Sequence, residues 1–111
     1  MRVRFLYSED CPSHDEALAR LRAVLAEEDV RAGVEIVRVE TFEDAEREHY
    51  PGSPTILIDG EDICPMPPGT HYAPACRTYV LEDGRFSPLP SVLMIRRAVR
   101  AAKANLKNPT Q

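Results

Sequence analysis

The sequence predicts an α/β domain whose elements follow the order β-α-β-α-β-β-α. Short alternating or β-branched apolar runs are separated by segments in which apolar residues recur every three or four positions, a pattern typical of this class. The first forty or so residues read as a strand–helix–strand unit, which usually places its strands in parallel. The chain of 111 residues is long enough for one core, so we expect a single domain spanning 1–111.

Turn and cap residues set the bounds of each predicted element. Four strands are expected, at Arg2 to Tyr7, Val34 to Val39, Thr55 to Ile58 and Arg77 to Leu81. Three helices are expected: about Pro12 to Glu28, a short one capped by Thr41 and Asp44 and broken at Tyr50 to Pro54, and one running from Ser91 to a stop at Asn108-Pro109. Residues 61–75 form a long proline-rich loop, and long loops in small domains are usually functional or mobile.

Cys11 is the best candidate for chemistry, because it stands between the first strand and the first helix. Pro12 suits a first helical turn, which assigns Cys11 to the N-cap position. There the free amide groups and the helix dipole favour the thiolate. Two features oppose this: Ser13 and Glu16 form an alternative S-x-x-E cap, and the two acidic residues on each side of Cys-Pro raise a thiol pKa. The alternative is a buried free cysteine that acts as a small hydrophobe.

Two motifs at these positions resemble the thioredoxin-like superfamily. Cys11-Pro12-Ser13-His14 lies where thioredoxins and glutaredoxins carry C-x-x-C, and Ser53-Pro54-Thr55 lies where they carry a cis-proline. The resemblance covers nearly the whole chain and implies a thioredoxin-like fold with a central four-stranded mixed sheet flanked by helices. It also implies a cis bond before Pro54, which proline alone adopts at low cost. Substrate-binding residues would be Pro12, Ser53, Pro54 and Thr55, with backbone beside Pro54 free to pair with a peptide or glutathione.

A closer resemblance is to a small bacterial group of thioredoxin-like proteins. The segment GSPT-x-x-x-DG followed by C-R-x-Y carries it. Some members have selenocysteine at the position of Cys11, and some are labelled alkylmercury lyase-like.

His14 departs from the family pattern, because it replaces the second cysteine of C-x-x-C and so excludes a dithiol reaction through that motif. Three residues after Cys11 on a helix, it can reach the sulfur as a catalytic proton donor or acceptor. The alternative is an exposed polar residue of the first turn.

Cys64 and Cys76 are possible second thiols. In the implied fold Cys64 follows the third strand, which runs away from Cys11, and Cys76 precedes the fourth strand, which returns. Both cysteines therefore start at the end of the sheet remote from Cys11, and a five-residue strand spans about 17 Å. We therefore expect them to lie closer to each other than to Cys11, unless the loop folds back. They are open to three interpretations: a pair closing the loop, a weak C-x6-H-x4-C metal site with His71, or two unrelated thiols.

Composition excludes several classes of function. The formal charge of −4 divides into −10 over residues 1–83 and +6 over 84–111. The basic face of the last helix suits its negative end, so neither nucleic-acid binding nor a membrane partner is expected. No apolar run approaches about 20 residues, and Met1 to Tyr7 is too short and charged for a signal peptide, so we expect a cytoplasmic protein. In a reducing compartment its three cysteines should be free, catalytic or metal-linked rather than structural disulfides.

The leading hypothesis is a monothiol redox protein in which Cys11 attacks a disulfide or another oxidised thiol. The mixed disulfide is released by an external thiol, or by Cys76 or Cys64. Cys11 should then be the first cysteine alkylated at neutral pH. The partner is a thiol or disulfide, protein or small molecule; no resident cofactor is expected, with glutathione or another low-molecular-weight thiol as co-substrate. The alternatives are a binding module without turnover and thiol-based handling of a soft metal or organomercurial.

Overall fold

The computed structural model describes residues 1–107, with only the backbone of Leu106 and Lys107. The predicted stop at Asn108-Pro109 and the side chains of Leu106 and Lys107 lie outside the described residues. The strands are β1 (Val3–Tyr7), β2 (Val34–Arg38), β3 (Thr55–Ile58), β4 (Glu61–Asp62), β5 (Tyr79–Val80) and β6 (Phe86–Ser87). The helices are α1 (His14–Glu27), α2 (Phe42–Glu48) and α3 (Val92–Lys107).

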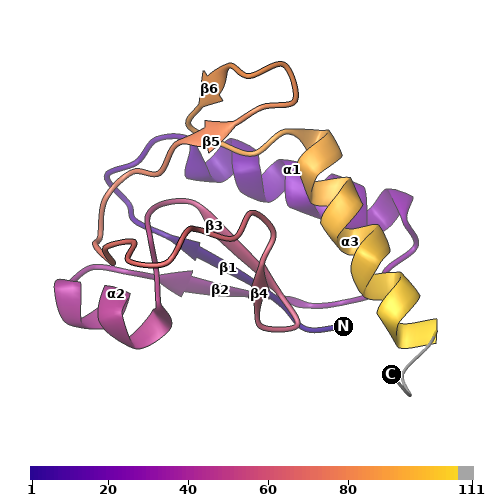
Figure 1. Ribbon diagram of the computed structural model, residues 1–111. Helices are drawn as coiled ribbons and strands as arrows, with labels where there is room; N and C mark the ends of the chain where they lie inside the picture. The colour runs from indigo at the N-terminus through magenta and orange to yellow at the C-terminus, as the bar shows by residue number, and fades with distance from the viewer. Residues whose placement is uncertain (108–111) are drawn as a thin grey trace.

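The protein is a mixed α/β structure built on a four-stranded mixed sheet of order β2-β1-β3-β4 (Figure 1). β1 pairs with β2 in parallel, as the strand–helix–strand unit predicts. β3 runs antiparallel to β1 and aligns Phe5 with Ile56. β4 returns antiparallel along β3.

The fourth strand of the central sheet is β4, and the prediction that Arg77 to Leu81 would form it was wrong. β4 comes directly after β3, because Asp59 and Gly60 both adopt positive φ, the conformation of a two-residue hairpin turn. The predicted strand at 77–81 is reduced to β5, which pairs with β6 in a separate two-stranded sheet. Residues 63–78 are thereby left outside the central sheet.

The two faces of the sheet are covered by different helices (Figure 1). On one face α1 and α3 pack together over β1 and β3, with Leu21, Ile95 and Val99 fully buried. On the other face Leu6 packs with Ala45 of α2 and with Tyr50. Ala45 is fully buried, whereas Phe42, the first residue of α2, is 68% exposed.

Helix caps agree with the sequence for α2 and α3 but not for α1. The Thr41 hydroxyl accepts from the Asp44 N–H, and the Ser91 hydroxyl accepts from the Met94 N–H. α1 begins at His14, with Ser13 rather than Cys11 at the N-cap position. The Ser13 side chain does not cap the helix; its hydroxyl donates to the carbonyl oxygen of Pro88 at 3.4 Å.

The basic face of α3 is paired with the end of α1. Arg96, Arg100 and Lys103 all form ion pairs with Glu28, which follows the last residue of α1. The Lys103 ammonium also donates to the Glu28 carbonyl oxygen at 2.7 Å, serving a terminal carbonyl of the helix. These ion pairs and this hydrogen bond join α3 to the C-terminal end of α1.

Replacing Glu28 by glutamine is expected to destabilise the protein at neutral pH and not in acid. The Arg100 guanidinium holds the pKa of this carboxyl below its ordinary value, with Lys103 and Arg96 adding to the effect. A lowered folded pKa gives stability that is present above the unfolded pKa of about 4.3 and is lost as pH falls through the folded pKa. Urea unfolding of both proteins between pH 7 and pH 3 should show curves that converge in acid.

Glu46→Gln is the matched control, because Glu46 is an exposed carboxylate of α2 that forms no ion pair within residues 1–107. A Glu28 difference that persists at low pH would contradict the charge-based account.

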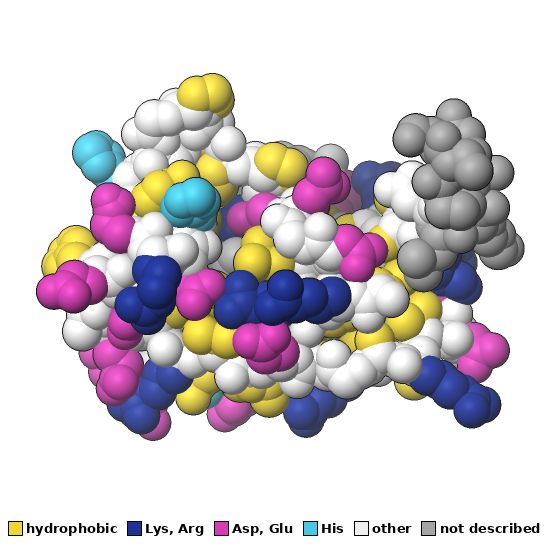
Figure 2. Space-filling model, turned by 90° about the horizontal axis from the view of Figure 1, so that it is seen from below, with side chains coloured by type: hydrophobic (Ala, Val, Ile, Leu, Met, Phe, Trp, Pro, Cys, Tyr) yellow, Lys and Arg dark blue, Asp and Glu magenta, His cyan; other side chains and the backbone are white. Residues whose placement is uncertain are grey.

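The face that carries α2 is covered by interleaved acidic and basic side chains (Figure 2). Arg4 pairs with Glu48 at 3.0 Å, and Arg38 pairs with Glu40 at 3.2 Å. Neighbouring carboxylates therefore neutralise these arginines. Within residues 1–107, none of the helices combines the length and apolar character needed to cross a membrane.

Candidate active site around the Cys11–Cys76 disulfide

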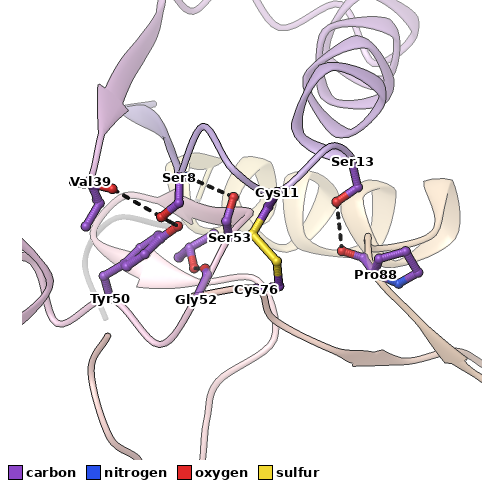
Figure 3. Close-up of a disulfide and its surroundings, with 10 residues drawn as sticks. Ser8, Cys11, Ser13, Val39, Tyr50, Gly52, Ser53, Cys76 and Pro88 are labelled. Atoms are coloured by element: carbon purple, nitrogen blue, oxygen red, sulfur yellow. Dashed lines mark hydrogen bonds between the residues drawn. A yellow bond between two sulfur atoms is a disulfide. The ribbon is translucent and has the colours of Figure 1, made fainter. Parts of the chain in front are cut away.

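Cys11 and Cys76 form a disulfide, with their Cα atoms 5.7 Å apart (Figure 3). This overturns the expectation that Cys76 lies nearer to Cys64 than to Cys11, and it also rules out a Cys64–Cys76 pair. The expectation assumed that residue 77 begins a strand of the central sheet. β4 fills that edge instead, so residues 63–78 fold back to the end of the sheet where Cys11 lies.

Ser53 joins the two cysteine segments. Its N–H donates to the Ala75 carbonyl at 2.7 Å, and its carbonyl accepts from the Arg77 N–H at 3.0 Å, so Cys76 lies beside it in a parallel β-bridge. Its hydroxyl accepts from the Ser8 N–H at 2.9 Å. The Cys11 N–H in turn donates to the Ser8 carbonyl at 3.1 Å. Contacts other than the disulfide therefore hold the two cysteines together.

The Ser53–Pro54 peptide bond is cis, which confirms the expectation for this position. The expectation of free backbone beside Pro54 was wrong, because residues 75–77 of the same chain occupy the Ser53 groups. Ser53, Pro54 and Thr55 are all buried. The Thr55 hydroxyl donates to the Gly52 carbonyl at 2.6 Å. Of the four predicted substrate-binding residues, only Pro12 is exposed.

Arg77 anchors the segment that carries Cys76. Its side chain is 1% exposed and forms an ion pair with Asp62 at 2.8 Å. It also donates to the Thr55 hydroxyl at 3.2 Å and to the Cys64 carbonyl. Burial lowers the pKa of this guanidinium, but its electrostatic and hydrogen-bonding partners, Asp62 among them, outweigh burial and raise the pKa above its ordinary value.

Two buried tyrosines complete the support of the site. The Arg77 guanidinium carbon lies 4.5 Å from the centre of the Tyr79 ring, and the Tyr79 hydroxyl donates to the Pro54 carbonyl at 2.5 Å. Burial raises the pKa of Tyr79 far above its ordinary value, which keeps the hydroxyl neutral as a donor. The Tyr50 hydroxyl lies 2.9 Å from that of Ser8 (Figure 3), and burial raises its pKa as well.

The two sulfur-bearing residues differ in exposure. Cys11 is 2% exposed, whereas Cys76 is exposed. Two of the four carboxylates that flank Cys11 in sequence form ion pairs with arginines: Glu9 pairs with Arg38, and Glu16 pairs with Arg20 at 2.8 Å.

The remaining candidate residues, His14 and Cys64, make contacts with other side chains. The His14 ring packs on Tyr7, with centroids 4.6 Å apart, and its Nδ1 lies 3.3 Å from Asp15. The described residues show no hydrogen bond between His14 and either bonded cysteine. Cys64 is a free, partly buried cysteine whose N–H donates to Asp62.

In the part of the chain that the structure describes, no group of three or more His, Cys, Asp or Glu side chains could hold a metal ion. The C-x6-H-x4-C arrangement with His71 is not formed, since Cys76 is bonded to Cys11.

Sequence reasoning missed the residues that support the site, namely buried Ser8, Tyr50, Arg77 and Tyr79 and partly buried Asp62. For Arg77 and Tyr79 a signal was present, because C-R-x-Y places a charge and a phenol directly after Cys76. Ser8, Tyr50 and Asp62 give no such signal, since their role depends on contacts distant in sequence.

No protein-family model matches this chain, and neither do any curated protein sequences or solved structures.

Proposed function

We propose that this protein is a thioredoxin-like thiol–disulfide redox protein whose redox-active pair is Cys11 and Cys76. The observation that carries the proposal is that Ser53 holds both cysteine segments by hydrogen bonds that do not involve sulfur. Such a pair stays adjacent after reduction, which favours reversible closure of the disulfide. The strand order β2-β1-β3-β4 and the position of Cys11 ahead of α1 support the thioredoxin-like assignment.

In the proposed reaction the reduced protein reduces a substrate disulfide by two exchanges. One cysteine thiolate attacks the substrate and releases its first thiol, which leaves a mixed disulfide. The other cysteine then attacks the protein sulfur of that mixed disulfide, releases the second substrate thiol and re-forms the Cys11–Cys76 bond. The protein loses two electrons to the substrate, and external thiols such as glutathione return them.

The proposal predicts that the oxidised protein is reduced while it remains folded. We expect a midpoint potential above about −300 mV in glutathione or dithiothreitol buffers, the range of exchangeable rather than structural disulfides. Acid quenching, maleimide labelling and intact mass measurement report the reduced fraction, and circular dichroism reports the fold.

Cys64→Ser is the control and should leave the potential unchanged, since Cys64 is free. A disulfide that is reduced only as fast as the chain unfolds would instead be a structural staple, and the redox proposal would fail.

A further inference from the structure

Resting on the proposed function, we propose that Cys76, and not Cys11, is the sulfur that exchanges with the external partner, while Cys11 is the internal resolving thiol. This reverses the role that the sequence motif gives to Cys11 toward the substrate. The first observation is exposure: Cys11 is 2% exposed and Cys76 is exposed. Thiol–disulfide exchange depends on access to the attacked sulfur.

The second observation is that the segment bonded to Cys11 through Cys76 is fixed. The backbone of Ser53 bonds on both sides of Cys76, to Ala75 and to Arg77. The Arg77 side chain is buried in an ion pair with Asp62. A Cβ placed on Gly52 would lie 2.8 Å from the Cβ of Arg77, so the two backbones are in close contact. Moving residues 75–77 away from Cys11 would break all of these contacts.

The third observation is that the Ser53 backbone is already paired. A substrate peptide cannot add to this edge as a strand unless it displaces residues 75–77. An attack on Cys76 needs no such displacement. The class of partner that fits is therefore one that reaches an exposed cysteine without strand pairing: a low-molecular-weight thiol or disulfide, or a protein disulfide on an exposed loop.

The exchange steps balance with these roles. In the reductive direction an external thiolate attacks the Cys76 sulfur, the Cys11–Cys76 bond breaks, and Cys11 leaves as a thiolate just before the N-terminal end of α1, where negative charge is favoured. A second external thiol then attacks the mixed disulfide, releases Cys76 as a thiolate and forms an external disulfide. Two electrons pass from the external thiols to the protein, and the same steps in reverse reduce a substrate disulfide.

Two single variants made in a Cys64→Ser background test the assignment with glutathione disulfide as the probe. In Cys11→Ser, Cys76 should form a stable glutathione mixed disulfide, because no resolving thiol remains. In Cys76→Ser, modification of Cys11 must wait for local opening and should be at least about 100-fold slower. Both variants lack the disulfide, so they are matched in that respect, and intact mass measurement follows both reactions.

A second measurement avoids dependence on the folding of the variants. The reduced protein, otherwise unchanged, is treated with less than one equivalent of N-ethylmaleimide, and peptide mapping should find the label on Cys76 before Cys11. Label on Cys11 first would overturn the assignment while leaving the redox pair intact. A pair that shows no exchange in the folded protein, with no mixed disulfide on either cysteine, would instead overturn the proposed function together with the assignment.

Discussion

Replacing Arg77 by methionine is expected to lower the free energy of unfolding of the oxidised protein by about 3 kcal/mol, because it breaks a buried ion pair and leaves Asp62 without its cation. The Arg77 side chain is 1% exposed and that of Asp62 is 17% exposed. The same change removes donors to the Thr55 hydroxyl and the Cys64 carbonyl. Each buried acceptor that loses its donor adds to the cost. Urea unfolding measures the difference.

The chain offers a matched control in Arg85→Met. Arg85 also pairs with an aspartate, Asp83, at 2.6 Å, but its side chain is 76% exposed. Surface pairs of this kind contribute at most about 1 kcal/mol. Equal losses in the two variants would show that Arg77 does not anchor the segment carrying Cys76. Lysine at position 77 should not restore the wild-type stability, because it cannot reproduce the several hydrogen bonds of a planar guanidinium.

The parts of the fold that sequence reasoning predicted correctly depend on local patterns. The apolar spacing of α3 places Ile95 and Val99 in the core, and the Thr41–Asp44 pattern starts α2 as predicted. These signals lie within a few residues of the structure that they specify, so one sequence is enough to find them.

The errors come from contacts between residues distant in sequence. Asp59-Gly60 is a dipeptide that favours a turn, but the two-residue strand after it is too short and polar to be found by alternation. Once β4 occupies the sheet edge, residues 63–78 follow a different path, and the position of Cys76 changes with it. The pairing of Cys11 with Cys76 thus depends on one short hairpin.

The candidate site was predicted in part for the same reason. Cys11 lies between β1 and α1 as predicted, and Ser53-Pro54 directly precedes β3, because strand and helix patterns close to these residues fix their positions. The occupant of the Ser53 backbone was not predictable, since nothing local to Ala75 or Arg77 indicates that they pair with a residue more than twenty positions away.

Gly52→Ala is expected to destabilise the protein by about 3 kcal/mol, through strain and overpacking together. Gly52 has a φ of +147°, a conformation that L-residues with side chains rarely adopt. An added Cβ would lie 2.8 Å from the Arg77 Cβ and 3.1 Å from the Arg77 backbone nitrogen. Backbone on the opposite side cannot rotate away as a flexible side chain can, so the two segments must separate.

Gly84→Ala separates the two contributions. Gly84 also has positive φ, at +87°, but an added Cβ there would meet nothing within 4 Å. Gly84→Ala should therefore lower the free energy of unfolding by only about 1 kcal/mol, the cost of holding a residue with a Cβ at positive φ. Urea unfolding compares the two variants, and the rate of disulfide closure after reduction reports on the spacing of the cysteines. Gly52→Ala should slow that closure because it pushes residues 75–77 away from Ser53, whereas Gly84→Ala should leave it unchanged. Closure at the wild-type rate in a destabilised Gly52→Ala protein would show that the Ser53–Cys76 bridge does not set the distance between the two thiols.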